Sequence, residues 1–349
     1  MSASPTFSAL SIPRRSKPVG GAVKRRVCLA GALCASLLLA ACAPYPVVPT
    51  DPALPRSREL VDTPFFPQEQ YQCGPAALAT VLNSAGAGVS PEQVQPLVYL
   101  PGNKGSLQAE MLAAPVHYGY LAVPLPPSLD SLLQELSDGR PVLVLQNLGV
   151  AMLPLWHYAV VIGYDLDRQL VYLRSGRDRR KVYDIRRFLK TWSRAGHWAL
   201  VAVRPGEIPV SATAQAYLQA ASALERRQRP QAALQAYRAG TRRWPEQALL
   251  WAASGNAAYS LARYAEAEAA YRTALSLQPG KPAIMNNLAL ALARQDCRQT
   301  ALEVLACAAR AAPANPVIDD TLLEIKAMPP GTGGCRAFDC PVPGVGRRP

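Results

Sequence analysis

A cysteine and a histidine lie in sequence contexts that could make them a nucleophile and its base. Cys73 opens the run Cys-Gly-Pro-Ala-Ala-Leu, where Pro75 suits an early helical position and the residues behind it propagate a helix. The N–H groups and positive end of such a helix predict a thiolate at Cys73 with a lowered pKa. His157 opens the apolar run 157–164, which predicts a strand. A thiolate nucleophile needs a nearby imidazolium, so we expect the two side chains to face each other.

Each of these residues also has a plainer interpretation. Taken alone, Cys73 fits a small buried residue, and His157 fits a strand-end histidine with one satisfied hydrogen bond. Their joint occurrence in matching contexts favours a catalytic pair. His197, at the start of another predicted strand, is a weaker alternative base, whereas His117 is interpreted as structural. No cysteine or histidine spacing indicates zinc, and the sequence predicts no cofactor.

The elements around this pair predict an α+β domain over residues 63–205. The Cys73 helix should end near residue 85. Further helices are expected after residues that can cap them: Ser90, Ser106, Ser128 and Asp184. Short apolar runs predict strands at 120–123, 141–146, 157–164, 169–174 and 197–203. Helices followed by mostly antiparallel strands would bring the two candidate residues together.

From about residue 214 the composition changes to alanine-rich helices with a fixed period. Matching residues recur at intervals of 34 in four sets: Pro245, Pro279 and Pro313; Tyr217, Trp251 and Met285; Ala233, Ala267 and Ala301; Tyr237, Tyr271 and Leu305. This pattern resembles the tetratricopeptide repeat, in which paired helices lock through small and large residues. A plain alanine-rich helical bundle is the alternative. The resemblance implies three units over 212–326, in an all-α solenoid whose concave face suits a peptide or a protein partner.

The Cys-Gly-Pro-Ala-Ala-Leu run at Cys73 and the His-Tyr-Ala-Val-Val-Ile-Gly-Tyr run at His157 resemble the papain-like cysteine peptidases. Within that clan they are similar to the bacteriocin-processing (double-glycine leader) peptidases, and the resemblance covers about residues 65–203. It implies that Cys73 is the nucleophile and that His157 is the general base and acid. It also implies that Gln68 helps to bind the oxyanion, with Gln70 a less favoured substitute.

Two positions depart from the family pattern. Gln68 lies five residues before Cys73, where six is common in papain-like enzymes. The family usually has an aspartate on the strand after the histidine, and Ser175 stands in its place. A hydroxyl can accept from the imidazole N–H, but it cannot stabilise imidazolium as a carboxylate does. The site is therefore expected to work as a dyad with Ser175 or Asp178 orienting the histidine, or to have reduced or no activity.

The first 41 residues resemble a bacterial lipoprotein signal peptide. A basic segment ends at Arg26, an apolar run covers 27–39, and the Leu-Ala-Ala-Cys sequence that ends at Cys42 fits the lipobox. The resemblance implies that Cys42 becomes the lipidated first residue; an uncleaved membrane anchor is the alternative. Ala43 replaces the aspartate associated with inner-membrane retention, which predicts attachment to the outer membrane of a bacterial envelope, facing the periplasm. Proline-rich residues 42–62 would form a tether.

Five cysteines follow the predicted signal into an oxidising compartment. Their odd number predicts at least one free thiol, with Cys73 as the candidate. Cys335 and Cys340 are close enough to pair in a tail, 327–349, that is otherwise expected to be disordered. Cys297 and Cys307 would lie about 15 Å apart on one helix and should not bond each other.

The charge distribution argues against nucleic-acid binding, and three other functions remain. Six of the 37 basic residues precede position 42, so 31 remain against 24 acidic residues, without a basic stripe for nucleic acid. The first remaining function is an envelope-anchored cysteine peptidase whose repeats recruit its peptide or protein substrate. The second is a non-catalytic binding lipoprotein, which Ser175 supports. A peptidoglycan amide hydrolase ranks third, because such papain-like enzymes usually have Ser-Gly after the cysteine.

Overall fold

The computed structural model describes residues 50–67, 72–103, 105–150, 152–331 and 335–340. The described residues all belong to one compact unit of the chain, 48–349. The predicted signal peptide, Cys42, Gln68 and Gln70 lie outside the described residues. Within the described ranges no helix is long and apolar enough to cross a membrane.

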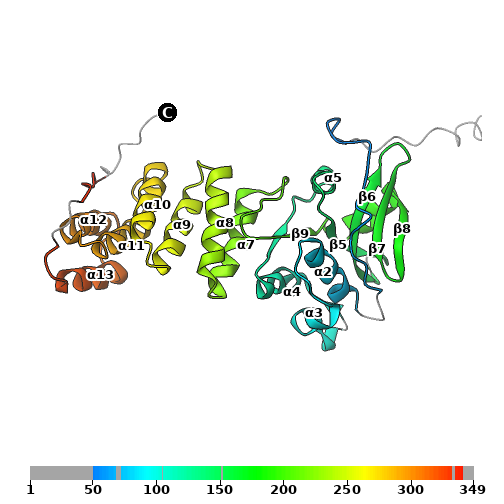
Figure 1. Ribbon diagram of the computed structural model, residues 1–349, viewed down its shortest axis with the longest axis horizontal. Helices are drawn as coiled ribbons and strands as arrows, with labels where there is room; N and C mark the ends of the chain where they lie inside the picture. The colour runs from blue at the N-terminus through cyan, green and yellow to red at the C-terminus, as the bar shows by residue number, and fades with distance from the viewer. Residues whose placement is uncertain (1–49, 68–71, 104, 151, 332–334, 341–349) are drawn as a thin grey trace, which may run out of the picture. The chain divides into compact units, whose positions relative to one another are not determined.

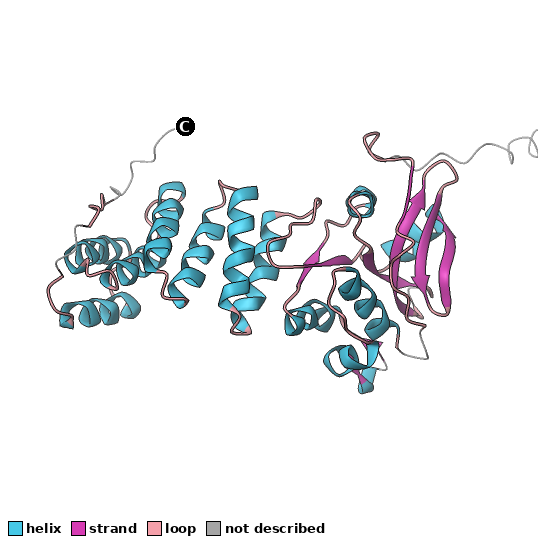
Figure 2. Ribbon diagram, viewed as in Figure 1, coloured by secondary structure: helices cyan, strands magenta, loops and turns pink. Residues whose placement is uncertain are grey.

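An antiparallel sheet forms the centre of the first domain (Figures 1 and 2). Its strands lie in the spatial order β4-β9-β5-β6-β7-β8. Their bounds are β4 Leu121–Pro124, β5 Val142–Asn147, β6 Trp156–Asp165, β7 Leu170–Ser175, β8 Asp178–Asp184 and β9 Ala199–Val203. The long strand β6 pairs with β5 over its first part and with the short strand β1 (Ser57–Glu59) over its last residues. The sheet therefore places the start of β6, where His157 lies, between β5 and β7.

Helices cover both faces of this sheet. They are α2 Cys73–Ser84, α3 Pro91–Val98, α4 Gln108–Ala113, α5 Leu129–Ser137 and α6 Ile185–Ser193. Alternate residues of β5 belong to different cores: Leu143 packs in one core with Leu78 of α2, and Val144 packs in the other with Phe188 of α6. Every residue of β5 is buried, which explains its unbroken apolar run. The predicted α+β architecture of this domain is confirmed.

Three of the four predicted helix caps are present. Ser90 forms a capping box with Gln93, Ser128 accepts from the N–H of Ser131, and Asp184 accepts from two N–H groups of α6. The prediction for Ser106 is wrong. It lies in strand β3 (Gly105–Ser106), which pairs with β2 (Tyr99–Leu100), and α4 begins after Leu107 without a side-chain cap. Two short 3₁₀ helices, Pro101–Asn103 and Ala114–Tyr118, complete this region.

Besides the short β2–β3 pair, two strands of the main sheet were not expected from the sequence. β1 lies inside the predicted tether, 42–62, so the end of that segment belongs to the sheet. Its three residues carry no apolar pattern, and pairing with β6 holds them in place. β8 is largely exposed and polar, and it extends the sheet beyond β7. Neither strand has the alternation of apolar residues that signals a half-buried strand.

The second domain consists of paired helices that follow one another in sequence (Figure 1). They are α7 Ala214–Arg226, α8 Pro230–Arg243, α9 Ala248–Ser260, α10 Tyr264–Leu277, α11 Pro282–Ala293, α12 Arg298–Ala311 and α13 Pro316–Ala327. The 34-residue period is also present in the backbone. Gln228, Ala262 and Asp296 each have a positive φ in the turn inside a helix pair, and their numbers differ by 34. The matching alanines Ala233, Ala267 and Ala301 are fully buried. The predicted tetratricopeptide solenoid is confirmed.

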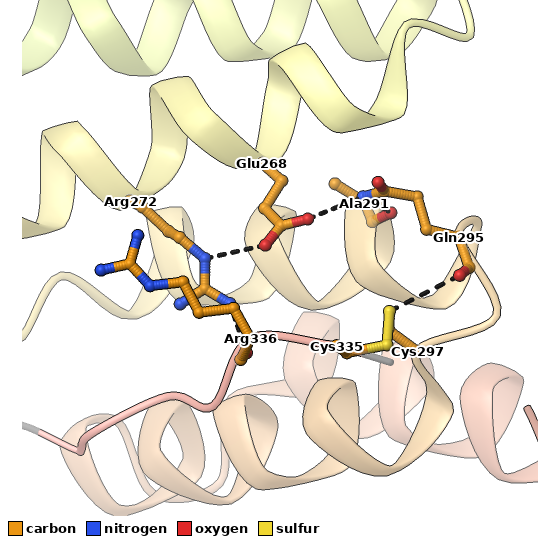
Figure 3. The surroundings of a disulfide bond; sticks show 7 residues. All are labelled: Glu268, Arg272, Ala291, Gln295, Cys297, Cys335 and Arg336. Carbon is orange, nitrogen blue, oxygen red and sulfur yellow. Dashed lines mark hydrogen bonds and ion pairs between the residues drawn. A yellow bond between two sulfur atoms is a disulfide. The ribbon is translucent and has the colours of Figure 1, made fainter. Parts of the chain in front are cut away.

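The expected pairing of the tail cysteines is wrong. Two disulfides join the tail to the third repeat, Cys297 to Cys335 and Cys307 to Cys340. Residues 335–340 are therefore fixed on the repeats, where a disordered tail was expected. Figure 3 shows the first disulfide beside Arg272 of α10, which donates to the carbonyl of Arg336 and pairs with Glu268 at 2.8 Å. Closing loops of 38 and 33 residues should stabilise the repeats by roughly 3–4 kcal/mol each. Sequence proximity misled the prediction because the partners come together only when the repeats fold.

Candidate active site

Cys73 is the first residue of α2, and the helix places its thiol against strand β6. Residues Gly74 to Leu82 behind it are all buried, so α2 is held firmly against the sheet. The thiol accepts hydrogen bonds from backbone N–H groups, among them those of Gly74 and Tyr158. Cys73 is also the free cysteine of the described residues. The structure thus presents one unpaired thiol at the start of a buried helix.

The thiol of Cys73 contacts the backbone next to the candidate base, His157. Tyr158, whose N–H reaches the sulfur, directly follows His157, so the thiol contacts the peptide unit that joins these two residues. Among the described residues no hydrogen bond links the thiol to the His157 ring. The structure brings the two predicted residues to the same end of β6, with the imidazole held by a different partner.

That partner is Ser175, the last residue of β7. His157 Nε2 and Ser175 Oγ are 2.8 Å apart, and Ser175 is 3% exposed. When Nε2 carries the ring proton, it donates to the hydroxyl. Nδ1 is then the ring nitrogen available to take a proton from a thiol. Ser175 therefore occupies the orienting position that the family resemblance assigns to an aspartate.

Burial opposes charge on both members of the pair. It raises the pKa of the Cys73 thiol, and the backbone N–H donors offset this effect only in part. Burial also lowers the pKa of His157 to about 4, and the positive charge of Lys181 is the second cause. The predicted lowering of the Cys73 pKa is therefore wrong, because lost hydration outweighs the favourable charges at the helix start. At neutral pH the site contains a thiol and an uncharged imidazole.

Asp178 does not supply the missing carboxylate. It lies opposite Ser175 in the β7–β8 register, and its carboxylate is 3.5 Å from Nζ of Lys181. The Asp178 side chain is mostly exposed and engaged in that ion pair. Where a carboxylate would favour imidazolium, His157 meets a neutral hydroxyl and the field of Lys181. This is the electrostatic departure of the site from a Cys-His-Asp arrangement.

A buried amide supports the strand beside the base. Gln146 of β5 lies opposite His157 in register, and its Nε2 donates to Thr191 Oγ1 at 2.7 Å. Thr191 belongs to α6, so this bond ties the helix to the sheet next to His157. The amide of Gln146 is occupied by this contact, which makes it a positioning residue.

The sequence did not predict a group of buried polar side chains near Cys73, formed by Ser106, Glu110 and Tyr158. The Tyr158 hydroxyl donates to the carbonyl of Ser106 at 3.2 Å. Burial raises the pKa of Tyr158, with Cys73 and Glu110 as further causes, so the hydroxyl remains a donor. Ser106 Oγ and Glu110 Oε2 are buried and have no hydrogen-bond partner within the described ranges. These residues come from separate elements, and no spacing in the sequence connects them.

Gly74 permits the close approach of this group to the nucleophile. A Cβ added at Gly74 would lie 2.7 Å from Cβ of Ser106 and would also collide with its Oγ. No side chain larger than hydrogen fits there unless Ser106 or the helix start moves. Packing directly beside the thiol thus requires glycine at position 74.

The other two histidines make different contacts. The His117 ring packs edge-on against Tyr118, with centroids 5.2 Å apart, and its carbonyl accepts from Arg229. The His197 ring packs against Trp192 at 4.8 Å, in the turn before β9. Like the ring of His157, neither ring is among the described groups that hydrogen-bond the Cys73 thiol. Within the described ranges no cluster of histidine, cysteine and carboxylate residues could hold a metal ion.

Models of two known protein families match separate parts of the chain. A sequence model of the Peptidase_C39 like family matches residues 60–200. The tetratricopeptide repeat model matches residues 217–282 and 252–316. A search of curated proteins found no match.

Solved structures similar to this chain fall into the same two groups. A C39-like peptidase from Bacillus anthracis is 18% identical, with 42% of this chain and 98% of that chain covered and a TM-score of 0.37. The second tetratricopeptide domain of human RPAP3, solved with an HSP70 peptide, is 19% identical over 33% of this chain and 96% of that one, with a TM-score of 0.32. The pilF protein of Pseudomonas aeruginosa is 21% identical over 32% and 52%, with a TM-score of 0.31.

Proposed function

Because the chain carries a domain of the Peptidase_C39 like family followed by tetratricopeptide repeats, we propose that it is a cysteine peptidase that hydrolyses peptide bonds through Cys73 and His157. One observation carries the proposal. The thiol of Cys73 lies on the peptide unit next to His157, whose ring is oriented by Ser175. The proposed nucleophile at the start of α2 thus lies against the start of β6, which carries the proposed base, and the orienting group lies at the end of β7.

The neutral state of the site sets the mechanism. The Cys73 sulfur attacks the carbonyl carbon of the scissile bond while its proton passes to Nδ1 of His157. The tetrahedral intermediate then collapses to a thioester, the C–N bond breaks, and His157 gives the proton to the leaving amine. Water attacks the thioester with His157 as base, which releases the carboxylic acid and restores the thiol. Ser175 accepts from Nε2 throughout and fixes the ring tautomer.

Oxyanion stabilisation is assigned to the start of α2. Backbone N–H groups there donate to the Cys73 sulfur in the structure. We propose that they turn to the developing negative charge once the sulfur bonds to the carbonyl carbon. Gln68 is proposed as a side-chain donor on the basis of the family resemblance. One such donor is worth about 2.7–4 kcal/mol of barrier lowering, so its loss should reduce turnover on the order of a hundredfold or more.

The repeats and the N-terminal segment extend the proposal beyond the site. We assign the concave face of the solenoid to a protein or peptide partner that presents the substrate. We assign Cys42 to lipid attachment, which would hold the peptidase on the periplasmic side of the outer membrane. Both assignments rest on sequence resemblance, and retention of Cys42→Ser in the membrane fraction would contradict the lipid anchor.

A second function is supported by the electrostatics of the site. Ser175 and Lys181 leave the imidazolium without a stabilising carboxylate, which favours a non-catalytic scaffold that retains the peptidase fold. The two candidates differ in one property. The peptidase must cleave peptides in a Cys73-dependent manner, and the scaffold must not.

Peptide cleavage by the full-length protein tests the proposal. Cys73→Ala should abolish cleavage of a peptide pool, and His157→Ala should lower it by about 10²–10⁴-fold through loss of the base. The wild-type rate should fall with acid through the His157 pKa of about 4 and stay level toward neutral pH, because the neutral imidazole is the active form.

The matched control for that experiment is His117→Ala, whose ring packs on Tyr118. It should retain the wild-type rate and pH profile. Cleavage that survives in Cys73→Ala would eliminate the proposed mechanism, and absence of cleavage by every variant would favour the scaffold.

A further inference from the structure

Large apolar side chains gather at the turn between β5 and β6 and are exposed to solvent. We call this group the apolar tip: Val150, Met152, Leu153, Leu155 and Trp156. Met152 is 97% exposed and Leu153 is 77% exposed. The other large apolar residues that are exposed in the described ranges stand apart from one another in the sequence. Single exposed apolar residues are ordinary, whereas a contiguous group marks an interaction surface.

Hydrogen bonds hold the apolar tip in a defined conformation. Val150 and Leu153 exchange backbone bonds at 3.2 and 3.1 Å. The Asn147 side chain accepts from the N–H groups of Gly149 and Leu155, both at 3.0 Å. Arg194 donates to the carbonyl of Gly149 from outside the turn. The described residues at both ends of the turn therefore have hydrogen-bonded backbones, which lowers the entropy cost of binding to their side chains.

The apolar tip adjoins the candidate catalytic pair. Trp156 is the first residue of β6 and directly precedes His157. It lies opposite Asn147, the residue that holds the turn. A peptide whose scissile carbonyl sits at Cys73 would lie near this surface, since the Cys73 thiol accepts from the N–H of Tyr158, two residues after Trp156.

The position of the apolar tip argues for a peptide as its occupant. The tip ends at the start of β6, where the N–H of Tyr158 donates to the Cys73 thiol. A peptide placed for attack by that thiol would therefore lie beside the tip.

We propose that the apolar tip binds apolar side chains of the substrate peptide next to the bond that is cut, an inference that rests on the proposed peptidase function. The tip then acts as a specificity surface. Peptides with leucine-like residues near the scissile bond are held at Cys73, and polar peptides are released.

Peptide binding to the full-length Cys73→Ala protein tests this inference without turnover. A short fluorescent peptide rich in leucine should bind at least about tenfold more tightly than a matched peptide with serine in place of each leucine, which corresponds to burial of about one leucine side chain. The double substitution Met152→Ser and Leu153→Ser should remove this preference. Leu323→Ser, which changes an exposed leucine of α13, should retain it.

Two outcomes would overturn the inference. One is an unchanged leucine preference in the double variant. The other is quenching of Trp156 fluorescence by phosphatidylcholine vesicles with brominated acyl chains, identified by its loss in Trp156→Phe, which would assign the tip to lipid. Cleavage by the wild-type protein separates the two proposals. Cys73-dependent cleavage with no dependence on the tip removes this inference alone. Tip-dependent binding without cleavage removes the peptidase and leaves a peptide-binding surface.

Discussion

Ser175→Asp should convert the neutral thiol of Cys73 and imidazole of His157 into a thiolate–imidazolium ion pair. This should raise kcat/KM for peptide cleavage on the order of a hundredfold or more. Ser175 Oγ lies 2.8 Å from His157 Nε2, so a carboxylate there would face the imidazole N–H directly. An opposite charge at such a distance raises a histidine pKa by roughly 1–3 units. The wild-type pKa of His157 is about 4, with burial and Lys181 as its causes. The added carboxylate opposes both and favours imidazolium beside a Cys73 thiolate.

The pH dependence gives the sign of this effect. The acid limb of the wild-type profile should lie near pH 4, where His157 takes up its proton. In Ser175→Asp the His157 pKa is higher, so the acid limb should move toward neutral pH. Alkylation of Cys73 by iodoacetamide at pH 6 should become at least about tenfold faster, because more thiolate is present.

Two variants make that experiment specific. In Ser175→Asn the new side chain has nearly the shape of aspartate but carries no charge. This variant should therefore leave the pH profile close to that of the wild type. Asp178 lies opposite position 175, so Ser175→Asp is also prepared with Asp178→Asn to remove like-charge repulsion. Equal rates in the aspartate and asparagine variants would show that the missing carboxylate does not limit the site.

Gly74→Ala should reduce cleavage by about a hundredfold while the rest of the fold remains. The added Cβ would lie 2.7 Å from Cβ of Ser106, which is closer than real contacts allow. Ser106 and the start of α2 must separate, and this moves the Cys73 thiol away from the N–H of Tyr158. A displacement of about 1 Å at a reacting group can cost that much in rate.

A second substitution makes the prediction sharper. Ser106→Gly removes both atoms that collide with the new Cβ, and the next contact is Met111 Sδ at an ordinary 3.6 Å. The double variant should therefore recover most of the activity, although Ser106→Gly alone should lower the stability slightly. Failure of this rescue, in a folded protein, would mean that Gly74 acts through something other than space.

The repeats and most of the first domain follow from local patterns in the sequence. In a repeat protein each unit packs only on its neighbours, so each unit needs similar residues at the same positions. The 34-residue period is therefore visible in one sequence and predicts the architecture directly. Ser90, Ser128 and Asp184 could be identified as caps because capping depends on residues only a few positions apart. The β5 and β6 runs could be read as strands because both faces are buried.

The errors come from interactions between distant parts of the chain. β1 forms because β6 offers it an edge, and its own residues give no apolar pattern. Ser106 resembles a helix cap, but pairing of β3 with β2 uses its backbone instead. Cys335 and Cys340 are neighbours in sequence, yet the folded repeats bring each to a different cysteine of the third unit.

The candidate site shows the same division. Cys73, His157 and Ser175 could be selected from spacing and resemblance, because each lies at a recognisable point of a helix or strand. Their charge state could not, since it depends on burial by residues from several elements and on Lys181 of β8, a strand that was not predicted. The polar group of Ser106, Glu110 and Tyr158 escaped notice for the same reason.

The central claim is that Cys73 forms a covalent bond with a peptide carbonyl while His157 moves the proton. Its most direct test is intact-mass analysis of the full-length protein, quenched with acid during incubation with a cleavable peptide. We expect a thioester on Cys73 in the wild type, a larger amount formed per unit time in Ser175→Asp, and very little in His157→Ala. Absence of the adduct in both the wild type and Ser175→Asp, or cleavage without an adduct in Cys73→Ala, would contradict the account.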